Sequence, residues 1–445
     1  MNESNFKMNL ANSNRRGFLT SAPLLAASLL SLDAFASGTA GSIPKARKQL
    51  VLRSSWQTVN IGDIGHTPGV LHLLEKHLPE VDVRLWAGDV GNGVREMLAN
   101  RFPKLEIFTN SDNEAVARAM QECDFLLHGS GPSLVARSDV KRWKEETGKP
   151  YGVYGITFPG VYSEDPKEVV EANPLDIELL NAAAFAFFRD SVSLDLAKKL
   201  GVHNAAMEFC PDGAFAVDLK NDAAATAFIN EHGLEEGKFM CVLPRNRLTP
   251  WWEIPSKNRS IDEKKNARNE LMREHDNAPL REAIIAVVRQ TPMKILLCPE
   301  DETQVKLGKQ IILDKLPEDV KEKVVWRDRY WLTDEAVSTY VRSAGIFGLE
   351  MHSPIMALGN GIPAIVGRFA EQTSKGFMWR DIGLNEWLFD FDNEADIARY
   401  VPAVLAMAQN PEAARKKAAK GRKFVEQRQK ETMKMLGKTL DIQSK

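Results

Sequence analysis

Cysteine and net charge are the two features that this chain has least of. Four cysteines occur in 445 residues: Cys123, Cys210, Cys241 and Cys298. They are isolated on apolar stretches and form no CxxC or Cys/His ligand spacing, which argues against a zinc site and a disulfide framework, although one disulfide stays compatible with the pattern. The formal net charge is only -2, with both signs mixed along the chain. A basic surface for nucleic acid is therefore not indicated.

Long hydrophobic runs are also missing, and the apolar region near the N-terminus, residues 22–30, is too short to span a bilayer. It follows Arg15 and Arg16 and precedes a small-residue cleavage pattern at 34–36. Residues 1–36 therefore resemble a twin-arginine-type signal peptide. We expect export to a periplasm or the cell exterior, with no integral membrane segment after the signal is removed. An uncleaved tether or a fortuitous arginine pair is the alternative.

From residue 48 onward, short apolar runs alternate with amphipathic stretches, and the chain is 44% hydrophobic and 27% charged. Strict alternation of this kind predicts parallel strands joined by crossover helices, such as strands at 151–156 and 239–243 and helices at 94–101, 113–122 and 302–316. The long polar stretch 245–273 is interpreted as an insertion. A polar stretch near 219–237 divides two such series. We therefore expect an N-terminal Rossmann-like domain at 45–235, a C-terminal one at 236–392 and helices at 393–445. This is an α/β fold with two halves facing across a cleft, as in the GT-B arrangement. No pattern bears on the oligomeric state.

The most informative stretch lies at 344–367. An apolar run at 344–349 ends in Glu350 and His352, a small-residue helix begins at Ser353, and a second apolar run starts at Pro363. A loop between a parallel strand and the following helix is where α/β folds place ligands. We therefore predict Glu350 and His352 as a catalytic acid/base pair. The alternative is that His352 is an ordinary residue at the start of a helix.

A second candidate lies after the first predicted strand, 50–53. We expect residues 58–69, rich in glycine, to form a loop before a helix at 70–78, so that backbone N–H groups can approach an anion. The glycine spacing does not match the Rossmann fingerprint. Asp63 is predicted to be catalytic and His66 to bind substrate, against the alternative of a simple turn and helix cap.

Other polar residues follow predicted strands and are predicted to bind substrate. They are His128, Gly129, Ser130, Gly131, Arg189, Arg245, Arg247 and Trp251. Small residues expose backbone amides, arginine forks hold carboxylates or phosphates, and tryptophan stacks on sugar faces. Tight turns, surface ion pairs and a hydrophobic anchor are the corresponding structural explanations.

Four of these stretches, in this order, resemble signatures of the polysaccharide pyruvyl transferase family. They are 60–63, 128–131, 187–202 with 211–215 after it, and 347–367. The resemblance spans most of the chain and implies a GT-B-like fold, phosphoenolpyruvate as donor substrate and a glycan diol as acceptor. One position departs from it, because the family usually has an arginine two residues before the histidine and this chain has Glu350.

Three functions are compatible with these observations. The first is transfer of pyruvate from phosphoenolpyruvate to a glycan as a ketal. The second is an exported enzyme of the same fold that removes ketal pyruvate with water, which the signal and Glu350 favour because phosphoenolpyruvate is not normally supplied outside the cell. The third is a non-enzymatic glycan-binding protein. We expect no cofactor, no metal-ligand cluster is visible in the sequence, and the predicted partner is a glycan rather than nucleic acid.

Overall fold

The computed structural model describes residues 47–158 and 171–442. The predicted signal peptide, 1–36, lies outside these residues. Within the described part, no helix combines the length and the apolar character needed to cross a membrane.

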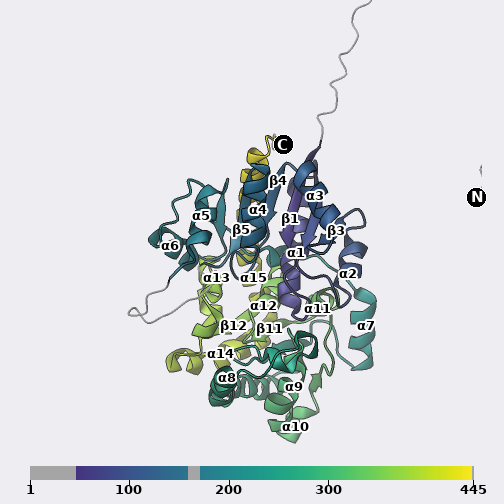
Figure 1. Cartoon of the computed structure of the whole chain (residues 1–445). Helices are drawn as coiled ribbons and strands as arrows, with labels where there is room; N and C mark the ends of the chain where they lie inside the picture. The colour runs from purple at the N-terminus through teal and green to yellow at the C-terminus, as the bar shows by residue number, and fades with distance from the viewer. Residues whose placement is uncertain (1–46, 159–170, 443–445) are drawn as a thin grey trace, which may run out of the picture. The chain divides into compact units, whose positions relative to one another are not determined.

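The first half is a seven-stranded parallel sheet in the order β3-β2-β1-β4-β5-β6-β7. Figure 1 labels β1, β3, β4 and β5 of this sheet. Its strands are β1 (Lys48–Ser54), β2 (Val81–Ala87), β3 (Glu106–Thr109), β4 (Phe125–His128), β5 (Tyr151–Ile156), β6 (Ala186–Phe188) and β7 (Met207–Phe209). Its helices are α1 (Ile61–His77), α2 (Val94–Arg101), α3 (Asn113–Glu122), α4 (Arg137–Thr147), α5 (Pro174–Ala182) and α6 (Ser191–Lys199). The strand order reverses between β1 and β4, which creates a crevice at their carboxyl ends.

The second half is a six-stranded parallel sheet in the order β10-β9-β8-β11-β12-β13. Its strands are β8 (Phe239–Leu243), β9 (Lys294–Leu297), β10 (Val324–Trp326), β11 (Gly345–Gly348), β12 (Ala364–Arg368) and β13 (Leu388–Asp390). Helices of this half are α7 (Asp222–Glu231), α8 (Glu263–Gln290), α9 (Thr303–Leu307), α10 (Glu318–Lys321), α11 (Thr333–Tyr340), α12 (His352–Gly359), α13 (Met378–Asp381) and α14 (Glu394–Gln409). The predicted α/β class with two Rossmann-like, GT-B-like halves is confirmed.

Apolar runs explain the central strands. Every residue of β4, β5, β8 and β11 is buried, as expected for parallel strands covered by helices on both faces. One apolar cluster contains residues of both sheets, and a second covers the other face of the first sheet. The polar ends of these strands are thus held by two rigid cores.

The start of α1 differs from the prediction, because 58–69 is not a loop. The helix begins at Ile61, where the side chain of Asn60 accepts hydrogen bonds from the backbone N–H groups of Gly62 and Asp63, at 2.8 and 3.1 Å. Glycines are needed here for close packing rather than for a loop. A Cβ on Gly69 would lie 1.9 Å from the carbonyl oxygen of Gly213, and one on Gly62 would lie 2.2 Å from Cβ of His352.

Two other regions also differ from the prediction. α8 begins at Glu263, so it absorbs much of the polar stretch that looked like an insertion, and the helix expected at 302–316 is divided into α9, a π-helical turn (Gly308–Ile312) and a 3-10 turn (Leu313–Lys315).

The last helix, α15 (Pro411–Thr439), returns to the first half of the molecule. Arg428 forms an ion pair of 2.7 Å with Glu208 of β7, and Gln429 donates a hydrogen bond of 3.2 Å to the carbonyl oxygen of Asp212. The chain therefore crosses from the second half to the first, and its end supports the segment that carries Asp212.

Candidate active site

A cavity of about 260 Å³ lies where strand ends of the two halves meet. It is lined by Gln57, Asn60, Asp63, Pro132, Arg189, Arg245, Thr249, Trp251, His352, Glu371, Gln372, Thr373 and Lys375. Five of the predicted site residues are among them: Asp63, Arg189, Arg245, Trp251 and His352. The carboxyl ends of parallel strands supply most of the polar groups, as the switch-point rule expects.

Three cationic side chains line this cavity. Arg189 follows β6, Arg245 follows β8, and Lys375 lies in a 3-10 turn (Lys375–Phe377) after β12. Arg189 is held by Asp212, with 2.8 Å between the guanidinium and Oδ2, and by Thr157 at 2.6 Å. These contacts fix the guanidinium at the cavity wall, which suits it to binding an anion.

Lys375 is a site residue that the sequence reasoning missed. Its Nζ has no hydrogen bond or ion pair within 47–158 and 171–442. Burial, and then the nearby Arg245, lower the pKa of Lys375 to about 8. Its position after a buried strand of the second sheet could have identified it, because the same rule identified the other candidates.

Glu350 faces Arg245 rather than standing free. The two form an ion pair of 2.6 Å, and the other carboxylate oxygen of Glu350 accepts a hydrogen bond from Gln304. Burial raises the pKa of Glu350 to about 7, against the effect of Arg245. Arg245 therefore supplies a cation beside the position where the family resemblance led us to expect an arginine.

Asp63 and His66 lie one helical turn apart on α1. His66 is fully buried and its Nδ1 lies 2.8 Å from Asp212 Oδ1 and 3.0 Å from Ser130 Oγ. Its Nε2 lies 3.8 Å from Asp63 Oδ1. Although burial opposes it, the neighbouring His352 and His66 rings, the charge of Lys375 and the hydrogen bond from Gln57 hold the pKa of Asp63 below its ordinary value. The carboxylate thus stays ionised at the edge of the cavity.

His352 begins α12 and its ring meets that of His66 edge to face, with centroids 4.8 Å apart. Neither ring nitrogen of His352 has a hydrogen-bond partner among the described residues, although Nδ1 lies 3.4 Å from Glu300 Oε1. Burial, and then the charges of Lys375 and His66, lower the pKa of His352 well below its usual value. A neutral imidazole is therefore presented to the cavity.

The segment from His128 to Gly131 lies behind the cavity wall. His128 stacks on Trp56 at 4.9 Å, and burial together with the charge of Arg53 lowers the pKa of His128 to about 3. The indole N–H of Trp56 donates to the carbonyl oxygen of Ser130 at 2.8 Å, and a Cβ on Gly131 would lie 2.7 Å from that nitrogen. His128, Gly129 and Gly131 shape the wall, and Ser130 reaches the site through His66.

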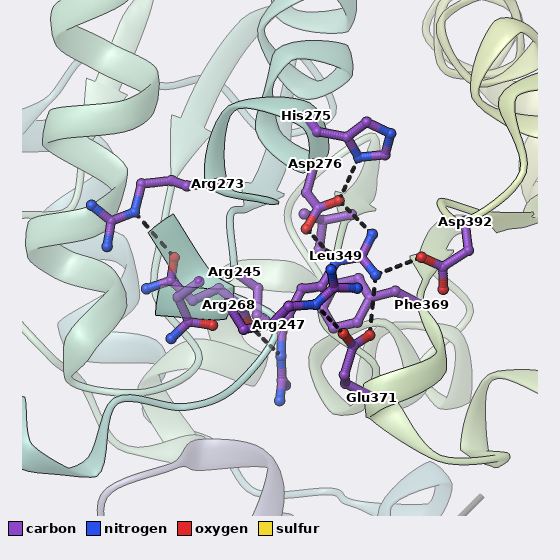
Figure 2. A network of polar contacts seen from close by, with 12 residues as sticks. Arg245, Arg247, Arg268, Arg273, His275, Asp276, Leu349, Phe369, Glu371 and Asp392 are labelled. Atoms are coloured by element: carbon purple, nitrogen blue, oxygen red, sulfur yellow. Dashed lines mark hydrogen bonds and ion pairs between the residues drawn. The ribbon is translucent and has the colours of Figure 1, made fainter. Parts of the chain in front are cut away.

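Arg247 is not among the residues that line the cavity. Figure 2 shows its guanidinium among the carboxylates of Asp276, Glu371 and Asp392. Its guanidinium makes two hydrogen bonds to Asp276, at 2.8 and 2.9 Å, and ion pairs with Glu371 at 3.1 Å and Asp392 at 2.5 Å. Glu371 begins the cavity-lining stretch that ends at Lys375. Arg247 therefore fixes the loop that presents Lys375.

Comparison with solved structures gives distant matches over nearly the whole chain. Alr3699/HepE of Anabaena, in complex with UDP and glucose, has 11% identity and a TM-score of 0.52 over 88% of this chain and 99% of that one. MnaA of S. aureus, in a UDP co-structure, has 11% identity and a TM-score of 0.52 over 89% and 98%. The UDP-GlcNAc 2-epimerase of Neisseria meningitidis, bound to UDP-GlcNAc, has 10% identity and a TM-score of 0.51 over 88% and 100%. Similarity at this level shows the fold alone.

Comparison with curated protein sequences gives no significant match. The sequence profile of the family described as polysaccharide pyruvyl transferase matches residues 60–366, which extend from the cap of α1 into β12 and contain most of the cavity lining. This family match supports an enzyme of the transferase class, and a glycan substrate is consistent with the family. The chain belongs to the polysaccharide pyruvyl transferase family.

Proposed function

We propose that this protein transfers pyruvate from phosphoenolpyruvate to two hydroxyl groups of a glycan, forming a cyclic ketal. The observation that carries the proposal is the convergence of Arg189, Arg245 and Lys375 on the cavity that also contains His352 and Asp63. Phosphoenolpyruvate carries its carboxylate and its phosphate on the same carbon, C2, and cations on both groups are what its binding requires.

The reaction makes defined demands on the two sides of the substrate. C3 of phosphoenolpyruvate gains a proton, one glycan hydroxyl oxygen bonds to C2, and the bond from C2 to the bridging oxygen breaks, releasing inorganic phosphate. The second hydroxyl oxygen then bonds to C2 and closes the ketal. Of the two protons that the hydroxyls lose, one balances the proton gained at C3 and the other leaves with phosphate.

The cavity residues match these demands by type. The cationic side chains stabilise the donor carboxylate and the departing phosphate, where negative charge is concentrated. The ionised Asp63 and the neutral His352 are suited to receiving hydroxyl protons. Trp251, which lines the same cavity, is suited to stacking on a sugar ring of the acceptor.

Hydrolytic removal of ketal pyruvate is the second candidate function. The specific observation that favours it is the arginine pair at 15–16 with the signal-like segment around it, because an exported enzyme would lack a supply of phosphoenolpyruvate. In this candidate the same cavity binds the pyruvate carboxylate of a finished ketal, and water takes the place of the second substrate.

One experiment separates the two candidates. Protein from Ser37 onward is incubated either with phosphoenolpyruvate labelled with carbon-13 at C3 and an unmodified glycan, or with a pyruvylated glycan alone, and products are followed by NMR. The proposal predicts a labelled ketal methyl group and an equal amount of phosphate in the first reaction. Free pyruvate only in the second reaction would favour removal, and no product in either would contradict both. The first reaction is also run with a Lys375→Met variant. Lys430→Met, which removes an exposed lysine, is its charge-matched control.

A further inference from the structure

Three side chains at the base of the cavity bring together a carboxylate and two imidazoles. Asp63 and His66 come from consecutive turns of α1, and His352 comes from the first turn of α12. One donor atom from each of the three lies within 4.8 Å of the others. The sequence showed no such cluster, because 286 residues separate His66 from His352 and only the packing of the two helices joins them.

The two histidines carry ring nitrogens that protein groups leave unused. Within the described residues, Nε2 of His66 and both ring nitrogens of His352 are buried without a hydrogen-bond partner. Buried polar atoms are nearly always satisfied in folded proteins, and an orphaned one points to a ligand or ion. Here two such rings, each with at least one buried nitrogen that lacks a partner, meet edge to face with centroids 4.8 Å apart.

Two of the three ligand candidates, His66 and Asp63, are held from behind by hydrogen bonds, and the third, His352, faces a carboxylate without bonding to it. Nδ1 of His66 lies 2.8 Å from Asp212, which Arg189 in turn holds at 2.8 Å. Nδ1 of His352 lies 3.4 Å from Glu300 Oε1. Gln57 donates a hydrogen bond to the remaining oxygen of Asp63. A carboxylate behind the imidazole is the usual arrangement for metal-binding histidines, because it fixes the tautomer and leaves the other nitrogen for the ion.

We propose that Asp63, Nε2 of His66 and Nε2 of His352 bind one divalent transition-metal ion, with zinc as the best match. Two imidazoles and a carboxylate suit zinc and its neighbours in the first transition row, whereas magnesium and calcium prefer oxygen ligands alone. Three protein ligands leave an open coordination position, which is typical of metals that contact substrate. That position faces the cavity, since Asp63 and His352 both line it.

With the ion bound, Asp63 and Nε2 of His352 would act as its ligands instead of as proton acceptors for the glycan hydroxyls. A hydroxyl oxygen bound to such an ion loses its proton more easily, as coordinated water does. Metal binding itself does not depend on the proposed pyruvyl transfer, so the two can fail separately.

The test is metal binding by chelator-stripped protein without any substrate. Calorimetry with zinc, and the visible absorption spectrum with cobalt, should show one equivalent of ion bound, with magnesium and calcium far weaker. His66→Gln and His352→Gln should each weaken zinc binding by at least about 100-fold, and Asp212→Asn by about 10- to 100-fold. Circular dichroism checks that each variant is folded. If His66→Gln does not fold, the test relies on His352→Gln alone.

His72 provides the matched control. It lies on the same helix and also faces a carboxylate, with 2.9 Å between its Nδ1 and Asp218, but it is outside the cavity. His72→Gln should bind zinc as the wild-type chain does. No saturable zinc binding, binding that survives in folded His352→Gln, equal loss in His72→Gln, or a preference for magnesium would each overturn the proposal.

Discussion

Replacing Lys375 by Met is predicted to weaken phosphoenolpyruvate binding by about 10- to 150-fold. The ammonium group is partly buried in the cavity and has no hydrogen bond or ion pair to the described protein residues, so an anion is its natural partner. A charge-assisted hydrogen bond of this kind contributes about 1.5–3 kcal/mol, and each 1.4 kcal/mol corresponds to about a tenfold change in Kd. Met keeps most of the apolar stem, so the change tests the charge.

The pH dependence of phosphoenolpyruvate binding provides a second, independent test of this prediction. Because burial and the charge of Arg245 lower the pKa of Lys375 to about 8, the side chain is positively charged below that pH and neutral above it. Affinity of the wild-type chain for phosphoenolpyruvate should therefore fall as pH rises through 8. The affinity of Lys375→Met should show no such fall. Lys375→Arg should bind phosphoenolpyruvate tightly both below and above pH 8, because a guanidinium stays charged.

Calorimetric titration of phosphoenolpyruvate on either side of pH 8 measures both effects. Lys430→Met, which removes an exposed lysine of α15, should bind like the wild-type chain. The reasoning is refuted if Lys375→Met retains wild-type affinity below pH 8, or if its affinity falls with pH as that of the wild-type chain does.

Three further predictions concern stability and export. Arg247→Met should lower the free energy of unfolding by about 3–5 kcal/mol, since it removes both arginine hydrogen bonds from the buried carboxylate of Asp276 and leaves it with His275 alone; a urea transition close to that of the wild-type chain would contradict this. Although burial opposes it, hydrogen bonds from His72 and Arg101 lower the pKa of Asp218 from 3.8 to about 2. Its contribution to stability is thus complete above pH 3.8 and is lost between pH 4 and 2, and Asp218→Asn should show a shallower decline of thermal stability over that window. Changing both arginines at 15–16 to Lys should keep the chain in the cytoplasm, and export of that variant on cell fractionation would argue against the twin-arginine route.

The fold was predictable where burial alone determines local structure. The strands at 151–156 and 239–243 and the helices at 94–101 and 113–122 have the expected bounds, because buried apolar runs and amphipathic periodicity specify them directly. The alternation of these elements was also sufficient to predict two parallel sheets.

The beginning of α1 could not be predicted in the same way. Three glycines within nine residues are typical of a loop, and only the close approach of neighbouring segments explains them in a helix. Gly65 faces Met356 of α12 at a separation that leaves no room for a side chain, with 2.8 Å between its hypothetical Cβ and the methionine sulfur. Such contacts depend on tertiary packing, which sequence periodicity does not contain.

The site was predictable in outline but not in its pairings. Strand ends identified Asp63, Arg189, Arg245 and His352, which line one cavity. The sequence could not reveal that Glu350 is paired with Arg245, because the two side chains belong to different strand ends 105 residues apart. A Glu350→Arg change would place a second guanidinium beside Arg245. It is expected to destabilise the buried site rather than to create a binding site for an anion, because Arg245 would lose its buried carboxylate partner.

The position of one oxygen atom tests the central claim most directly. Phosphoenolpyruvate labelled with oxygen-18 at the bridge between C2 and phosphorus is incubated with the protein and a glycan acceptor, and the phosphate is analysed by mass spectrometry. Pyruvyl transfer breaks the bond from C2 to that oxygen, so the account predicts one labelled oxygen in every phosphate released, in step with ketal formed on the glycan. Unlabelled phosphate with labelled free pyruvate, or phosphate release that does not require the glycan, would contradict it.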